Sequence, residues 1–268
     1  MEQDLYFIKL GGSIITDTSS PSTHRWDVIV RLLGEIKKAK DAKKFGVLIG
    51  HGGGSFGHVV AKEYKVHEGL INSQSGRGAE KTHDAMHQLN NIVVNAADEL
   101  ELSPYPFAPS SFAHSSDRTI VGGDLEGIRI AIEKGFTPIV HGDVMHDSKQ
   151  GISVASTEEV FRFISTGITP NKIILGTDTD GVFDADPASN PNAKLIPLID
   201  SSNIESVIAA TGGAKKVDVT GGMKTKISLL HEMVKRTKAT GYIVNASKPG
   251  VIENLLLGNE VTCTIVRA

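Results

Sequence analysis

Two patterns of apolar residues alternate along this chain. Short apolar runs that end near glycines are typical of buried strands, and apolar residues recurring every three to four positions are typical of amphipathic helices. The runs predict strands at 5–10, 45–49, 137–140, 172–175, 242–245 and 262–266. The helical spacing predicts helices at 29–44, 79–100, 125–134, 158–165, 204–210 and 225–237. A hairpin is expected between Val144 and Val154, with its turn near Gly151.

Alternating strands and helices predict the fold class. Right-handed crossover connections would place the strands in one mainly parallel sheet with helices on both faces. The 268 residues show no internal repeat, linker or low-complexity segment. We therefore predict one compact α/β domain, with room for two lobes.

Composition and charge exclude several classes of function. Lys and Arg total 28 against 31 Asp and Glu, a formal net charge of -3, so we expect no nucleic-acid partner. No apolar run approaches the ~20 residues of a membrane-spanning helix, and the acidic start lacks the features of a signal peptide. The single Cys263 allows neither an internal disulfide nor a cysteine zinc site. We expect a cytoplasmic protein without membrane contact.

Glycine clusters are the clearest chemical signal among the 28 glycines. They occupy 11–12, 52–57 and 221–222, and a lysine lies close to the first and the last, at Lys9 and Lys224. Backbone N–H groups at a helix start bind anions, and a lysine adds a point charge. Each cluster alone is more simply a tight turn, but three together favour binding of several phosphates.

The second cluster also fits the dinucleotide-binding pattern G-x-G-x-x-G at Gly52–Gly57. That motif requires an acidic residue about 20 residues later, and residues 72–75 are Asn-Ser-Gln-Ser. The P-loop pattern G-x-x-x-x-G-K-[ST] is absent from the sequence. Both nucleotide motifs are therefore disfavoured.

Several titratable residues follow the predicted strands. His58 closes the second glycine cluster, where it is either a helix cap or a donor to an anionic ligand. Asp143 and Asp178 are candidate functional residues, whereas Asp180 before Gly181 is more typical of a turn. His83 and His87 are one helical turn apart but lack a third ligand in the sequence pattern, so they are interpreted as surface residues and no metal site is predicted.

The motifs together resemble the amino acid kinase superfamily and, within it, the isopentenyl phosphate kinases. The matching segments are KLGGS at 9–13, HGGGSFGH at 51–58, HGD at 141–143, TDTDGV at 177–182 and VTGGMKTK at 219–226. Their order and spacing match from end to end. The resemblance implies a three-layer αβα fold around a sheet of about eight mainly parallel strands. It also implies an acceptor-binding lobe at 1–167 and a nucleotide-binding lobe at 168–268.

The resemblance further implies roles for individual residues. The expected catalytic residues are Lys9, His58 and Lys224. The expected ATP-binding residues are Lys9, Gly11, Gly12, Ser13, Thr177, Asp178, Asp180, Gly221, Gly222 and Lys224. The expected acceptor-binding residues are Gly53, Gly54, Ser55, His58, Thr157, Met86 and Ile152, with Val144 as a further candidate for the acceptor's tail. Asp143 is expected to orient the lysines.

Two departures from the family pattern stand out. The family places a second lysine nine residues after the first, where this chain has Thr18; Arg25 and Lys62 are candidate replacements for its charge. The family's Ser-Gly-Asp element is replaced by Ser156-Thr157-Glu158. Loss of one cation that stabilises the transition state lowers a rate by about 10²- to 10³-fold, by analogy with an oxyanion-hole donor.

The resemblance implies transfer of a phosphoryl group from ATP to isopentenyl phosphate, with Mg²⁺ bound through the ATP phosphates and a homodimer as the assembly. A kinase of another small phosphate or phosphonate, such as a fosfomycin kinase, is the alternative enzyme. A non-catalytic sensor of nucleotide or phosphate is the alternative outside catalysis, and Thr18 and Thr157 keep it open.

Overall fold

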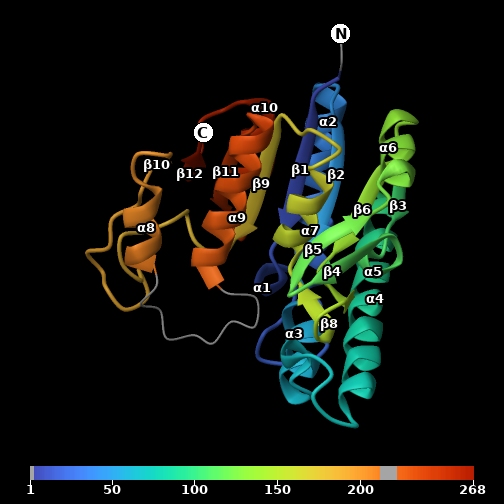
Figure 1. Ribbon diagram of the computed structural model, residues 1–268. Helices are drawn as coiled ribbons and strands as arrows, with labels where there is room; N and C mark the ends of the chain where they lie inside the picture. The colour runs from blue at the N-terminus through green and yellow to red at the C-terminus, as the bar shows by residue number, and fades with distance from the viewer. Residues whose placement is uncertain (1–2, 212–221) are drawn as a thin grey trace.

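The computed structural model describes residues 3–211 and 222–268 (Figure 1). Its main sheet contains β1 (Leu5–Leu10), β2 (Gly46–His51), β3 (Pro104–Pro106), β6 (Thr137–His141), β9 (Lys172–Thr177), β10 (Leu198–Ile199), β11 (Thr240–Asn245) and β12 (Cys263–Val266). These eight strands are ordered β10-β12-β11-β9-β1-β2-β6-β3, from left to right in Figure 1. Every neighbouring pair is parallel except β11 with β12. The predicted mainly parallel sheet is confirmed.

Helices cover both faces of this sheet. They are α1 (Gly12–Ile15), α2 (Trp26–Ala42), α3 (Gly54–Glu63), α4 (Ser75–Glu99), α5 (Pro109–Phe112), α6 (Glu126–Glu133), α7 (Thr157–Ile164), α8 (Ile204–Thr211), α9 (Gly222–Thr237) and α10 (Val251–Leu257), with a 3-10 turn, η1 (Val66–Glu68). No helix within 3–211 or 222–268 is both long and apolar enough to cross a membrane.

Alternation along β1 explains the three layers. Tyr6, Ile8 and Leu10 belong to one buried cluster, which they share with α2, α4 and α10. Leu5 and Phe7 point to the opposite face and belong to the cluster of α6, α7 and α9. Successive side chains of a strand face opposite sides, so a strand with apolar side chains on both faces needs a core on each side. The predicted αβα arrangement is confirmed.

A second, four-stranded sheet extends from the carboxyl end of β6. It consists of β4 (Ala113–Ser116), β5 (Thr119–Gly123), β7 (Asp143–Asp147) and β8 (Gly151–Ala155), ordered β5-β4-β7-β8. The predicted hairpin is confirmed, since Val144 pairs with Val154 and Gly151 has a φ of 82°. The sequence prediction missed β3, β4, β5 and β10, which are short, as well as α10.

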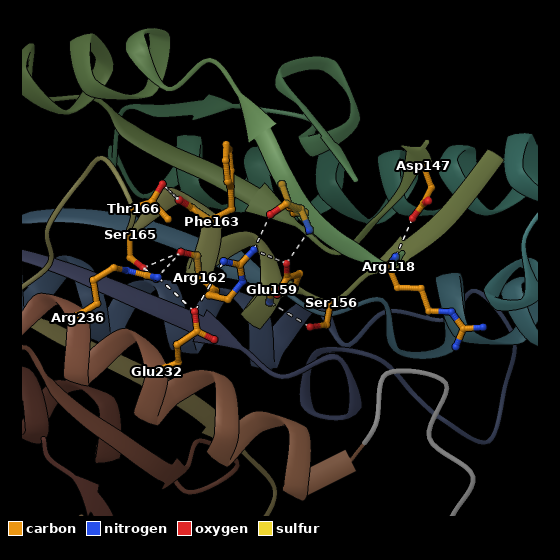
Figure 2. A network of polar contacts seen from close by, with 11 residues as sticks. Arg118, Asp147, Ser156, Glu159, Arg162, Phe163, Ser165, Thr166, Glu232 and Arg236 are labelled. Carbon is orange, nitrogen blue, oxygen red and sulfur yellow. Dashed lines mark hydrogen bonds and ion pairs between the residues drawn. The ribbon is translucent and has the colours of Figure 1, made fainter. Parts of the chain in front are cut away.

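A polar network fixes α7 against α9 and β5 (Figure 2). Glu159 accepts hydrogen bonds from Arg162 Nε at 2.8 Å and from the Ile120 amide at 2.8 Å. Arg236 of α9 donates to the Arg162 carbonyl and to Ser165 Oγ, each at 2.8 Å. At the start of α7, Ser156 Oγ accepts from the Glu159 amide at 3.2 Å, a helix N-cap. These contacts set the position of the first turn of α7.

We predict that Glu159→Ala destabilises the protein by about 2–4 kcal/mol, because it leaves the largely buried Arg162 and the Ile120 amide without their carboxylate. Urea unfolding followed by circular dichroism measures the change. Glu133→Ala, at an exposed position on α6, is the matched control and should change stability by less than about 0.5 kcal/mol. Equal effects of the two substitutions would contradict the structural role given to Glu159.

Candidate active site

A cavity of about 310 Å³ opens where β1, β2, β6 and β9 end. It is lined by Lys9, Gly11, Gly12, Ser13, Thr18, Gly52, Gly53, Gly54, Ser55, Gly57, His58, Val59, Ala61, Thr82, Met86, Gly142, Asp143, Val154, Ala155, Ser156, Thr157, Glu158, Gly176, Thr177, Asp178, Met223 and Lys226. Ligands of open α/β sheets bind at this edge. Two of the three glycine clusters predicted to bind phosphate meet here, and Gly221 of the third lies outside the described residues.

A buried ion pair lies at the centre of the cavity. Lys9, near the end of β1, is only 7% exposed, and its Nζ lies 2.5 Å from Oε1 of Glu158 in the first turn of α7. Burial alone raises the pKa of Glu158, but the charges of Lys9 and Lys226 outweigh it and hold that pKa below its usual value. Glu158 is therefore ionised and holds the Lys9 ammonium group toward the cavity.

A second lysine, Lys226, lines the cavity, and the role predicted for Lys224 stays a prediction. Met223 and Lys226 are three residues apart on α9 and both line the cavity. Lys224 is exposed and is not among the described lining residues. Residues three apart share a helix face, whereas positions 224 and 226 point in nearly opposite directions. The sequence prediction chose Lys224 because it lies close to the glycines, and it did not consider which face of α9 each lysine occupies.

Close backbone contact builds the wall between the first two glycine clusters. A Cβ atom at Gly12 would lie 2.4 Å from the Gly54 amide nitrogen, and one at Gly54 would lie 2.0 Å from Thr16 Oγ1. Gly54 also has a φ of 48°, which favours glycine. The Ser55 amide donates to Thr16 Oγ1 at 3.0 Å. Glycine at these positions brings the start of α3 against the loop after β1.

One side of the cavity is formed by α3, α4 and β8. His58 lines it from α3, Met86 and Thr82 line it from α4, and Val154 lines it from β8. Ile152, which we predicted there, is instead buried in a small core cluster that also contains Val144, the other predicted tail contact. Ile152 lies two residues before Val154 on the same face of β8, and Val154 both lines the cavity and packs against this cluster.

Two hydroxyl groups that line the cavity, those of Thr157 and Thr177, are hydrogen-bonded within the fold. Thr157, 1% exposed, donates from Oγ1 to the His51 carbonyl at 2.7 Å. Thr177 donates from Oγ1 to the Val244 carbonyl at 3.1 Å, and Asp178 follows it at the rim. Asp180, predicted to bind ATP, pairs with Lys248 Nζ at 2.5 Å and accepts from Asn245 Nδ2 at 3.0 Å outside the cavity lining. These contacts join the loop after β9 to the end of β11.

Asp143 lies at the cavity wall in contact with a histidine. Its Oδ1 is 2.7 Å from His83 Nδ1, and its Oδ2 accepts from the Ser110 amide at 3.2 Å. Burial alone raises the pKa of Asp143, but the hydrogen bond with His83 outweighs it and lowers that pKa overall. We predicted that Asp143 orients the lysines, and that role stays a prediction; the carboxylate that pairs with Lys9 here is Glu158.

The fold and the cavity together define a class of protein, and comparisons with known proteins give the same class. Residues 4–245 match the model of the amino acid kinase family, and the chain belongs to that family. Isopentenyl phosphate kinases are among its most similar relatives. The enzyme of Methanocaldococcus jannaschii is 33% identical, with 95% of each chain covered, and that of Methanothermobacter thermautotrophicus is 35% identical, with 97% of this chain and 98% of that protein covered.

Solved structures give the same result. A crystal structure of isopentenyl phosphate kinase superposes with a TM-score of 0.83 at 32% identity and covers 98% of this chain and 99% of that one. A product complex of the enzyme from T. acidophilum superposes with a TM-score of 0.79 at 25% identity, covering 98% of this chain and all of that one. The amino acid kinase fold predicted from the motifs is confirmed.

We predict that Gly54→Ala destabilises the fold by about 1–3 kcal/mol. Alanine is strained at positive φ, and its Cβ atom would collide with Thr16 Oγ1. Gly34→Ala is the matched control, since no atom lies within 4 Å of the added Cβ in α2, and should stabilise by about 0.5–1 kcal/mol. Thermal unfolding of both variants measures the contrast. A Gly54→Ala protein as stable as wild type would refute the close approach.

Proposed function

We propose that this protein transfers the γ-phosphoryl group of ATP to isopentenyl phosphate, giving isopentenyl diphosphate for isoprenoid synthesis. The observation that carries the proposal is the placement of Lys9, Glu158 and Lys226 at the cavity between two glycine loops. End-to-end similarity to isopentenyl phosphate kinases supports the choice of acceptor.

The reaction requires that the two substrates be aligned and that their negative charge be balanced, rather than a general base. An oxygen of the acceptor phosphate forms a new bond to the γ-phosphorus while the bond from that phosphorus to the β–γ bridging oxygen breaks, and ADP leaves with the electron pair. The acceptor phosphate is already ionised near neutral pH, so no proton has to be removed. Lys9 and Lys226 balance the negative charge that gathers during transfer.

We assign the two substrates to the two lobes, 1–167 for the acceptor and 168–268 for ATP. His58, Gly53 and Gly54 line the acceptor side, where backbone amides at the start of α3 suit a phosphate. Thr177, Asp178 and Lys226 line the other side, where the nucleotide phosphates would reach Lys9. Lys9 lies on β1, the central strand next to both halves, and is placed to contact the phosphoryl group in transfer.

The carboxylates of the cavity suggest how Mg²⁺ enters the site. Of the described lining residues, Asp143, Glu158 and Asp178 carry carboxylates. Glu158 is paired with Lys9 and Asp143 with His83, which leaves Asp178 as the carboxylate best placed to meet a hydrated ion. Mg²⁺ keeps several waters and binds through substrate phosphates in such sites, where it neutralises phosphate charge. We therefore assign Mg²⁺ to the ATP phosphates.

Thr18 lines the cavity where the family has a lysine. Neither Arg25 nor Lys62 is among the described lining residues, and Arg25 Nη2 lies 3.9 Å from Asp17. Lys9 and Lys226 are thus the lysines that the described part of the chain brings to the cavity. We further propose that the protein acts as a homodimer in the cytoplasm.

The substrate is tested by release of ADP from Mg-ATP with isopentenyl phosphate, dimethylallyl phosphate, geranyl phosphate, fosfomycin and simple amino acids. We expect the fastest turnover with the short isoprenyl phosphates. Turnover confined to fosfomycin would replace the acceptor but keep the kinase. ATP binding without turnover on any compound would favour a sensor and contradict the proposal.

Lys226 and Lys224 form a matched pair for testing the mechanism. We predict that Lys226→Met lowers kcat by about 10²- to 10³-fold, because a cation facing the transferring phosphate is lost. Lys224→Met, two residues away on the exposed face, should keep kcat within about threefold, since it removes a solvated charge. Steady-state kinetics with melting curves for both variants give the comparison. A large loss in Lys224→Met alone would restore the original sequence prediction.

A further inference from the structure

A cluster of metal-binding side chains lies beside the cavity and has no part in the proposed transfer. His83 and His87 are one turn apart on α4, and Asp143 begins β7 opposite them. One ring nitrogen of each histidine and one carboxylate oxygen of Asp143 all lie within 4.8 Å of one another. Strand β7 therefore supplies the third partner, Asp143, which the sequence pattern did not reveal because it lies 56 residues beyond His87 in the chain.

The three side chains are held in place by the fold. Asp143 is 1% exposed, and besides His83 its oxygens accept from the Val144 amide at 2.8 Å and the Ser110 amide at 3.2 Å. The His83 and His87 rings are 4.2 Å apart between centroids. A carboxylate fixed by backbone amides is a preorganised ligand, because its orientation costs no further entropy on binding.

One polar atom of the cluster lacks a partner. Nε2 of His87 is buried and has no hydrogen-bond partner among the described residues. Behind it, the His141 ring lies 5.6 Å from the His87 ring, and Nε2 of His141 is also buried without a partner in that part of the chain. A buried imidazole nitrogen without a partner is costly. A bound ion at the cluster would give one ring nitrogen of His87 a partner.

We propose that His83, His87 and Asp143 bind one divalent transition-metal ion of the zinc class. Two imidazoles and a carboxylate are ligands for such an ion, and an ion with three protein ligands keeps a further position for water. The ion takes the place of the proton that His83 and Asp143 share, and that proton passes to solvent. An opening of about 330 Å³ lined by Glu80, Lys81, His83, Asp84 and His87 gives the ion access.

The ion would link two walls of the cavity. Thr82 and Met86 of α4 line the cavity, and His83 and His87 follow each of them by one residue. Asp143 lines the cavity from β7 and belongs to the cluster as well. A metal bond across α4 and β7 therefore fixes the acceptor wall, which is a structural role distinct from the Mg²⁺ carried by ATP.

The site is tested with purified metal-free protein, without nucleotide or acceptor, so the result does not depend on the proposed kinase activity. Titration with Co²⁺ should show that one equivalent binds. The bound Co²⁺ should give a visible absorption band typical of a low coordination number. Addition of Zn²⁺ should displace the Co²⁺ and abolish this band. Free Zn²⁺ at about 100 times its Kd should raise Tm by about 5 °C. Mg²⁺ at millimolar concentration should not compete, because it prefers oxygen ligands.

Two variants and a control decide the assignment. His87→Gln and His83→Gln should each weaken Co²⁺ binding at least about 10-fold and remove the Zn²⁺-dependent rise in Tm, since even indirect partners of metal sites are worth 10- to 100-fold. His146→Gln, an exposed histidine on β7, should bind as wild type does. Wild-type affinity in His87→Gln, no bound Co²⁺ in the wild type, or displacement of Co²⁺ by Mg²⁺ would each overturn the proposal.

Discussion

The active-site half of this fold depends on the buried ion pair between Lys9 and Glu158. A lysine that is 7% exposed near the end of the central strand is stabilised by a carboxylate 2.5 Å away. Glu158 in turn belongs to the first turn of α7, whose position is set by the Glu159, Arg162 and Arg236 network. The charge of Lys9 at the cavity is thus anchored through contacts between α7 and α9.

Backbone supplies much of the remaining chemistry. The loops after β1 and β2 approach so closely that Gly12 and Gly54 leave no room for a Cβ atom. The backbone amides at the start of α3, a glycine-rich segment, therefore lie close to the cavity. This suits a reaction between two ionised phosphates, because fixed dipoles and two lysines oppose their repulsion without any proton transfer.

Helix α4 serves two adjacent purposes through two neighbouring rows of side chains. Thr82 and Met86 face the cavity, and His83 and His87 face Asp143. Rows one residue apart differ by about 100° around a helix, so the same helix can line a substrate pocket and hold a metal ion beside it. Asp143 belongs to the proposed metal site and also lines the cavity, so a bound ion would restrain the position of the cavity wall.

The sequence alone determined the layered fold, since runs such as Leu5–Leu10 place apolar side chains on both faces of a strand and need a core on each side. It also located the glycine loops and Lys9, because strand ends and turns are local features. Tertiary structure decided which lysine of α9 enters the cavity, Lys226 rather than Lys224, and that Asp143 meets His83. The phase of a helix against its neighbours and contacts across many residues arise from packing, which no local pattern encodes.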